Sequence, residues 1–141
     1  MALMALDLLA FLEYGHGPFV LALKRPTLEA FGLALYLAIS AWQIWTDAHL
    51  AKFFSLDEAP STPMVQGPYR YVRHPRYAAA ILGKVAMALV LASVVGWMLV
   101  IAWGLLLTKK IAVEERHLRE LFGSHYDSYA QSTAKIIPGI Y

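Results

Sequence analysis

The residues from Gly67 to Tyr77, in the order GPYRYVRHPRY, concentrate side chains that can bind or transform a ligand. Thirty residues follow with a single charge among them, and the adjacent acids Glu114 and Glu115 come after these. Charged groups beside an apolar run are costly to hold next to lipid unless they are paired or bind something. The pattern therefore predicts a membrane enzyme with a polar site at the water boundary.

Composition supports a membrane class. The 141 residues are 59% hydrophobic and 16% charged, and the mean hydropathy of +0.51 is high for a soluble domain. The length suits one integral membrane domain, residues 1–141. The small net charge of +2 argues against nucleic-acid binding. The absence of cysteine excludes disulfides, thiolate metal sites and a cysteine nucleophile. No other metal-ligand spacing appears, so no metal is expected.

The apolar runs predict an all-α, multi-pass transmembrane bundle of about four segments. Residues 27–46 form one clear span, with tryptophans near its end where an interfacial aromatic belt would lie. The run after Tyr77 is too long for one helix, so we expect a helical hairpin with arms at 77–93 and 96–113. Small residues at 93–96 favour the turn there.

The first stretch, residues 1–23, is long enough to cross a bilayer but contains Asp7, Glu13 and His16. It is a span, a re-entrant piece or an interfacial helix. Nine of the twelve basic residues lie in the 48–76 connection or after residue 108. The positive-inside rule therefore predicts that both segments, and the site they carry, face the cytoplasm.

The basic cluster has two interpretations. Arg70, Arg73 and Arg76 could simply anchor on lipid phosphates. Alternatively, the cluster belongs to a site, because Pro75 disfavours helix at His74 and leaves that residue extended to face a ligand.

The acids are also ambiguous. Adjacent helical residues point about 100° apart, so only one of Glu114 and Glu115 should face a given pocket. The other would form ordinary ion pairs on the helix surface. Lys84, inside the first hairpin arm, is a functional candidate by its position in a span. It could equally snorkel to the surface or pair with an acid such as Asp47.

Taken together, these motifs resemble the superfamily of isoprenylcysteine carboxyl methyltransferases and phospholipid methyltransferases. The resemblance covers residues 61–138, and its motifs are Gly-Pro-Tyr-Arg-Tyr-Val-Arg-His-Pro-x-Tyr, the apolar hairpin, Glu114-Glu115-x-x-Leu118, Phe122-Gly123, Tyr126, Tyr129 and Ile137-Pro138. It implies a helical membrane enzyme that uses S-adenosylmethionine. Residues 1–60 would then supply N-terminal membrane segments, and residues 61–141 a cofactor-binding methyltransferase region capped by the C-terminal tail.

The resemblance also implies roles for individual residues. Arg73 and His74 would bind the cofactor's carboxylate, and Glu114 or Glu115 its ammonium or ribose hydroxyls. The expected cofactor-binding residues are Tyr71, Val72, Arg73, His74, Pro75, Tyr77, Glu114, Glu115 and Tyr126. Arg73, Glu114 and Glu115 are the expected catalytic residues, and Lys84 and Trp42 are assigned to the acceptor. A base, where one is needed, would be the second glutamate or His117.

The acceptor is predicted to be lipophilic, reacting through a carboxylate, an amine or a hydroxyl. Two other functions remain open. Steroid-reductase-like membrane enzymes share Arg-His-Pro-x-Tyr but usually continue with Gly-Glu, where this chain has Ala79-Ala80; they would use NADPH. A non-catalytic membrane subunit that kept the fold is the third reading.

Overall fold

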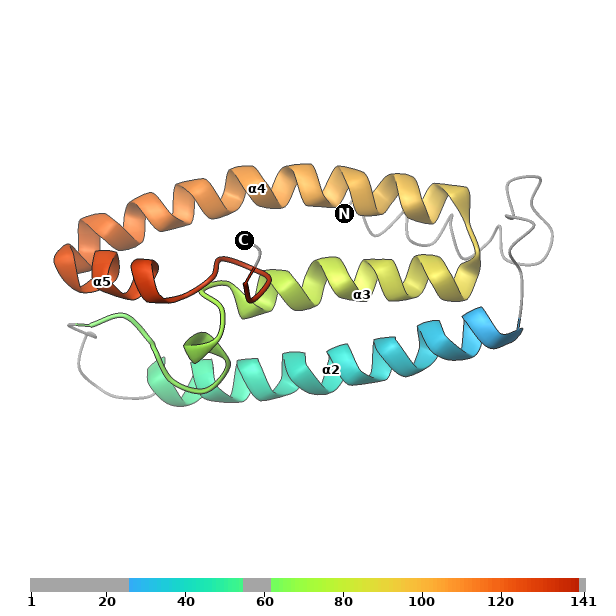
Figure 1. Cartoon of the computed structure of the whole chain (residues 1–141), viewed down its shortest axis with the longest axis horizontal. Coiled ribbons are helices and arrows are strands. Elements are labelled where there is room, and N and C mark those ends of the chain that lie inside the picture. Colours follow the sequence, from blue (N-terminus) through green and yellow to red (C-terminus); the bar gives the residue numbers. More distant parts are fainter. Residues whose placement is uncertain (1–25, 55–61, 140–141) are drawn as a thin grey trace. The chain divides into compact units, whose positions relative to one another are not determined.

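The computed structural model describes residues 26–54 and 62–139, and every regular element in them is helical (Figure 1). The prediction for residues 1–23 lies outside the described part. The elements are α2 (Pro26–Phe54), the 3-10 helix η1 (Gly67–Arg70), α3 (Pro75–Leu91), α4 (Val94–Phe122) and α5 (Ser124–Ser132). The predicted all-α class is thus confirmed for the described residues.

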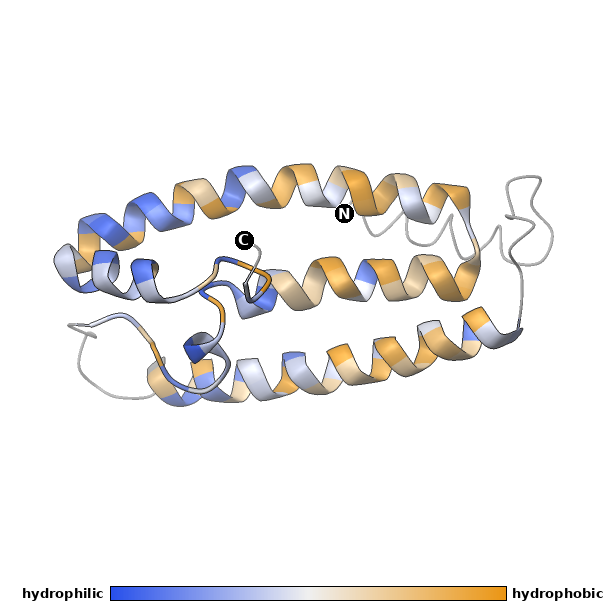
Figure 2. Cartoon of the chain, viewed as in Figure 1, coloured by the Kyte–Doolittle hydropathy of each residue, from blue (hydrophilic) through white to orange (hydrophobic). Residues whose placement is uncertain are grey.

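Two helices are long and apolar enough to cross a membrane, Pro26–Phe53 and Val94–Phe122. α2 continues past the predicted end at residue 46. No glycine or proline lies between residue 46 and Phe54, so nothing in the sequence stops the helix there. The 29 residues of α4 extend about 43 Å, more than a hydrocarbon core of about 30 Å. Figure 2 shows the change from apolar to polar along α4, which begins in sequence at Lys109. The charged end of α4 can therefore reach water.

The hairpin between α3 and α4 turns at Ala92 and Ser93, slightly before the predicted 93–96. The Ser93 hydroxyl accepts a hydrogen bond from the Gly96 amide at 3.2 Å. This cap starts α4 at Val94 and places Gly96 inside the helix. Ala92 adopts a φ of 45° to make the reversal.

The chain forms two compact units, and each long helix contributes to both. The first unit contains residues 80–106 and, of the described N-terminal part, residues 26–40. Its helices approach closely at small residues. A Cβ on Gly32 would lie 3.0 Å from the Ala86 carbonyl oxygen, so glycine is required there for close helix packing.

Of the described residues, the second unit contains 41–54, 62–79 and 107–139. α4 ends at Phe122, and Gly123, which follows it, has a φ of 52°. Glycine adopts this left-handed conformation without steric cost. After α5, the chain returns to the segment that precedes α3, as Figure 1 shows. Most of the predicted site residues lie in this unit.

Candidate functional site

The segment before α3 is held by the C-terminal tail. Val72 forms a parallel bridge with Ala134, and the Arg73 amide donates to the Ala134 carbonyl at 2.8 Å. The His74 amide donates to the Lys135 carbonyl at 3.0 Å, while the His74 carbonyl accepts from the amide of Ala78 at 3.0 Å in the first turn of α3. Pro75 begins the helix, where its missing N–H costs nothing. Backbone bonds therefore fix His74 between the tail and α3.

Glu115 lies among three cations and the His74 imidazole. It is only 4% exposed, and Arg73 Nε donates to its Oε1 at 3.0 Å. His74 Nε2 lies 3.4 Å from the same oxygen. Arg119 and Lys135 approach Oε2 at 3.5 and 4.0 Å. A buried carboxylate needs such partners, so the surroundings of Glu115 are those of a structural ion cluster.

Arg73 also holds the tail directly. Its Nη1 donates to the carbonyl of Ala130 at 2.7 Å and to that of Thr133. One guanidinium thus joins Glu115 on α4 to the end of α5.

His74 is buried next to this cluster, at 4% exposure. Burial lowers its pKa below the usual 6.5, although the nearby Glu114 and Glu115 favour the charged form. At neutral pH the imidazole is therefore neutral. Its ring stacks on that of Tyr77, with centroids 5.6 Å apart and planes 21° from parallel.

This pKa predicts how stability depends on pH. The unfolded chain takes up a proton on His74 near pH 6.5, but the folded protein does so only at lower pH. The contribution of His74 is therefore complete above pH 6.5 and is lost as the pH falls towards the folded pKa. Thermal unfolding in detergent between pH 8 and pH 5.5 should show a falling midpoint. The slope should be shallower in His74→Gln and unchanged in the exposed control His125→Ala; equal slopes in all three proteins would contradict this assignment.

Glu114 has different surroundings. It is half-buried and accepts a hydrogen bond from the Tyr77 hydroxyl at 2.6 Å. It lines a cavity, whereas Glu115 does not. Of the adjacent acids, Glu114 lines the cavity and Glu115 is enclosed by protein cations.

The cavity beside Glu114 has a volume of about 530 Å³, within the usual range for small-molecule sites. Aromatic and aliphatic side chains form much of its wall, including Leu50, Phe53, Pro63, Met64, Tyr69, Leu118, Leu121 and Phe122. Arg73, His74 and Arg76 supply nitrogen donors, and among the residues that the structure describes Glu114 is the only acid that lines it. The cavity thus combines an apolar wall with a few groups of both charges.

Tyr126 lines the same cavity and carries a buried hydroxyl. The residue is 1% exposed, and its hydroxyl has no hydrogen-bond partner among the described residues. Burial raises its pKa to about 12, so the hydroxyl stays protonated. By contrast, the Tyr129 hydroxyl donates to the Tyr69 carbonyl at 2.6 Å. An unpaired buried hydroxyl is costly, which marks Tyr126 as a group that a ligand would satisfy.

The remaining predicted residues do not line this cavity. Tyr71 is 55% exposed, and Val72 is buried in the contact with the tail. Trp42 donates from Nε1 to the Pro75 carbonyl at 3.3 Å and thereby supports the start of α3. Lys84 belongs to the first unit, and its assignment to the acceptor stays a prediction. The described residues contain no group of three or more side chains that could hold a metal.

Sequence reasoning missed several contributors. Arg76 lines the cavity and pairs with Asp47 at 3.0 Å. Lys135 completes the cluster around Glu115, whereas the Arg119–Glu115 pair is an ion pair of the kind expected from four-residue helix spacing. The basic cluster and the helix spacing indicated the arginines, and the resemblance implied a cap formed by the tail. No residue pattern predicted the pairing of Val72 with Ala134.

Comparison with protein-family models matches residues 27–125 to the family described as phospholipid methyltransferase. The match covers well over half of the chain and confirms the resemblance inferred from the motifs. Comparison with curated proteins and comparison with solved structures each found no match.

Proposed function

Because the chain belongs to the phospholipid methyltransferase family, we propose that it transfers the methyl group of S-adenosylmethionine to a lipophilic acceptor at the cytoplasmic face of the membrane. The family and the apolar helices make the protein a membrane methyltransferase. The choice of cofactor, the acceptor and the membrane face are parts of the proposal.

The cavity beside Glu114 carries the proposal, because its donor set fits the cofactor. S-adenosylmethionine combines a carboxylate, an ammonium, ribose hydroxyls, a sulfonium and an adenine ring. In the cavity, Arg73 and Arg76 can bind the carboxylate of the cofactor, and Glu114 can bind its positively charged groups. Phe53 and Phe122 supply apolar surface for the adenine ring.

When bound, the cofactor supplies a methyl group already activated by its positively charged sulfur. The protein must therefore orient the acceptor and exclude water, and it needs no nucleophile of its own. Glu114 would receive the proton that an amine or hydroxyl acceptor loses. Tyr77 holds the Glu114 carboxylate by its 2.6 Å hydrogen bond. Arg73 and the neutral His74 would bind the cofactor, and Glu115 would hold Arg73 in position.

For topology, we propose four membrane segments, with the second unit at the cytoplasmic surface. Two apolar helices and the density of basic residues in 48–76 and after 108 support this arrangement. Lys84 would then lie within the bilayer on α3.

The test is calorimetric titration of detergent-purified protein with S-adenosylhomocysteine, with NADPH in parallel. Saturable binding of S-adenosylhomocysteine alone is the expected result. Binding of NADPH alone would instead indicate a membrane reductase. Binding of neither would indicate a non-catalytic membrane protein.

Removing the Tyr126 hydroxyl should weaken cofactor binding without lowering thermal stability. Tyr126→Phe should weaken S-adenosylhomocysteine binding by about five- to tenfold, because the ligand loses one buried donor. Thermal stability without ligand should not fall, since that hydroxyl has no partner to lose. Calorimetry and thermal unfolding measure the two effects.

Tyr129→Phe is the matched control. Its hydroxyl already donates to Tyr69 within the protein, so its loss should cost about 1 kcal/mol of stability. Unchanged cofactor affinity in Tyr126→Phe would place the ligand elsewhere.

A further inference from the structure

Arg76 is a cation of the cofactor cavity that the motif of the resemblance leaves open. The motif reads Arg-His-Pro-x-Tyr, and Arg76 stands at the position marked x. It lines the cavity from the first turn of α3. Burial raises the pKa of Tyr69, another wall residue, and the nearby charge of Arg76 offsets part of that rise. Arg76 is therefore a feature of this chain that acts directly on the cavity.

The two arginines of the cavity differ in how far the protein already uses their donors. The side chain of Arg73 is 7% exposed, and it donates to Glu115 and to two carbonyls of the tail. The side chain of Arg76 is 54% exposed and forms an ion pair through Nε. A guanidinium carries more N–H donors than one carboxylate can accept. Arg76 is therefore better suited than Arg73 to bind the carboxylate of a ligand.

α2 holds Arg76 in place. Asp47 Oδ1 lies 3.0 Å from Arg76 Nε, and Gln43 Nε2 donates to Oδ2 of the same carboxylate at 2.9 Å. One turn earlier on α2, Trp42 donates to the Pro75 carbonyl at 3.3 Å. One helix thus contacts both the backbone before Arg76 and its side chain. Asp47 itself does not line the cavity, so its carboxylate can act on a bound ligand only through Arg76.

The ion pair between Asp47 and Arg76 has a small effect on stability, because the two side chains are 47% and 54% exposed. It does restrict the orientations of the Arg76 side chain, and Gln43 in turn restricts Asp47. A side chain that is already oriented loses less conformational entropy when a ligand binds it. The pair is therefore better explained by binding than by stability.

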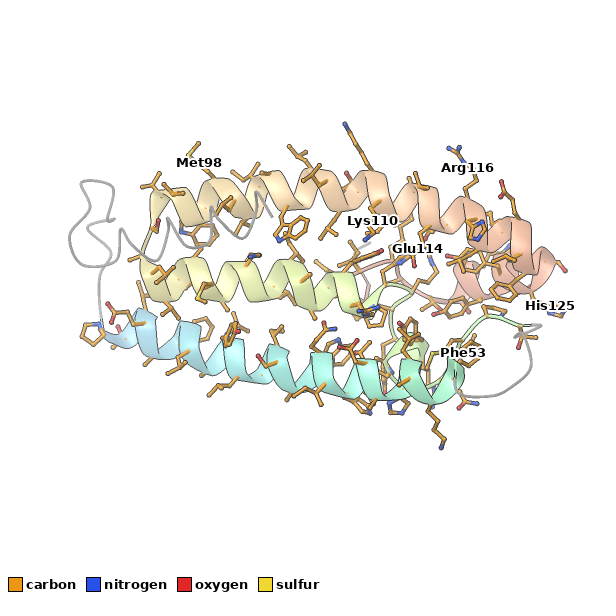
Figure 3. The ribbon with its side chains drawn as sticks, turned by 180° about the vertical axis from the view of Figure 1, so that it is seen from behind. Phe53, Met98, Lys110, Glu114, Arg116 and His125 are labelled. Atoms are coloured by element: carbon orange, nitrogen blue, oxygen red, sulfur yellow. The ribbon has the colours of Figure 1, made fainter. Side chains whose placement is uncertain are left out.

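The negative charge of the cavity comes from a different helix. Glu114 lies on α4, and Figure 3 shows it on the opposite side of that helix from Arg116. Besides burial, the charges of Arg76 and Glu114 both act on the pKa of Tyr69, so both groups lie near this phenol. The amino-acid part of S-adenosylmethionine carries a carboxylate and an ammonium on one carbon atom. Its two charges are complementary to Arg76 and Glu114.

We propose that Asp47 is a positioning residue for Arg76, and that Arg76 held in this way binds the carboxylate in the amino-acid part of the cofactor. This inference rests on the proposed function and adds to it a residue of α2 that lies outside the motifs of the resemblance. Arg73 mainly holds the tail, whereas Arg76 distinguishes ligands that have the amino-acid part from ligands that lack it.

Calorimetric titration of the detergent-purified full chain with two probes tests this assignment. The probes are S-adenosylhomocysteine and methylthioadenosine, which has the same adenosine and thioether groups but no amino-acid part. Arg76→Met should weaken S-adenosylhomocysteine binding about tenfold and leave methylthioadenosine binding unchanged. Asp47→Asn should weaken S-adenosylhomocysteine binding about threefold, again without an effect on methylthioadenosine.

The double variant Asp47→Asn/Arg76→Met separates positioning from a direct role. Because Asp47 acts through Arg76, the double variant should bind S-adenosylhomocysteine no more weakly than Arg76→Met alone. Arg76→Lys should recover part of the affinity, since lysine keeps the charge but lacks the planar fork. The unfolding temperature should change little in these variants, because the pair is exposed.

Arg70→Met is the matched control. Arg70 is an exposed arginine of the same basic segment, but it does not line the cofactor cavity. Its replacement removes the same charge and should leave the affinity for both probes unchanged.

Five results would overturn the inference. They are unchanged S-adenosylhomocysteine binding in Arg76→Met, an equal loss for both probes, an equal loss in Arg70→Met, additive losses in the double variant, and tighter binding in Asp47→Asn. The last result would mean that Asp47 competes with the ligand for Arg76. If the wild type binds S-adenosylhomocysteine while any of these results is obtained, only this inference fails. If the wild type does not bind it, the proposed function fails.

Discussion

A protein carrying Glu114→Gln should fold normally but transfer methyl groups about a hundredfold more slowly than the wild type. Of the described residues, Glu114 is the only acid lining the cavity proposed for the cofactor, and it also lines a second, more open cavity against α4. The amide keeps the shape of the side chain but cannot take a proton from the acceptor. Turnover with a phospholipid acceptor measures the loss, and S-adenosylhomocysteine binding should weaken less than about tenfold.

Glu115→Gln is the natural control, because the two acids are adjacent but differ in environment. Glu115 is buried against Arg73 and His74, so its replacement should mainly lower the unfolding temperature. Tyr77→Phe should produce a milder form of the Glu114 defect, since it removes the hydrogen bond that holds that carboxylate. A Glu114→Gln protein with full turnover would exclude Glu114 as the base.

Arg73→Ala should lower the free energy of unfolding by about 3–5 kcal/mol. The side chains of Arg73 and Glu115 are 7% and 5% exposed, so the substitution leaves a buried carboxylate without its closest partner. It also removes the donor to the carbonyls of Ala130 and Thr133. Thermal unfolding gives the stability, and amide hydrogen exchange over residues 130–135 should show that the tail has lost protection.

Two variants make this prediction specific. Arg119→Ala removes another cation near Glu115, but Arg119 is 47% exposed, so the loss should be about 0–1 kcal/mol. Arg73→Lys should recover only part of the stability, because lysine lacks the planar fork that reaches Glu115 and the carbonyls together. Equal losses in Arg73→Ala and Arg119→Ala would mean that Arg73 does not hold the tail.

Cofactor binding should also be weakened in Arg73→Ala. In our interpretation, this residue acts on the cavity partly by keeping the tail and α5 in place. Tyr126 lies on α5 and lines that cavity. Weaker cofactor binding in this variant would therefore have two causes, which are the displacement of α5 from the cavity wall and the loss of the Arg73 cation.

By itself the sequence determined the helical class, the apolar runs and the family. Uninterrupted hydrophobic stretches permit only a narrow range of structures in a membrane, and Pro75 and Gly123 set the start of α3 and the end of α4 through local backbone geometry. The pairing of the Arg73-His74 region with distant acids was also predictable from motif order.

Only the tertiary structure decided what each charged group does. Glu114 and Glu115 are neighbours of the same type, and no local rule distinguishes them. Their difference arises because the tail returns to residues 72–74 and brings Lys135 to the same region as Arg73 and Arg119. Contacts between residues about 60 positions apart depend on packing that helix periodicity does not encode. For the same reason, the sequence could not show that Tyr126 is left without a partner or that Tyr77 and Glu114 line two cavities.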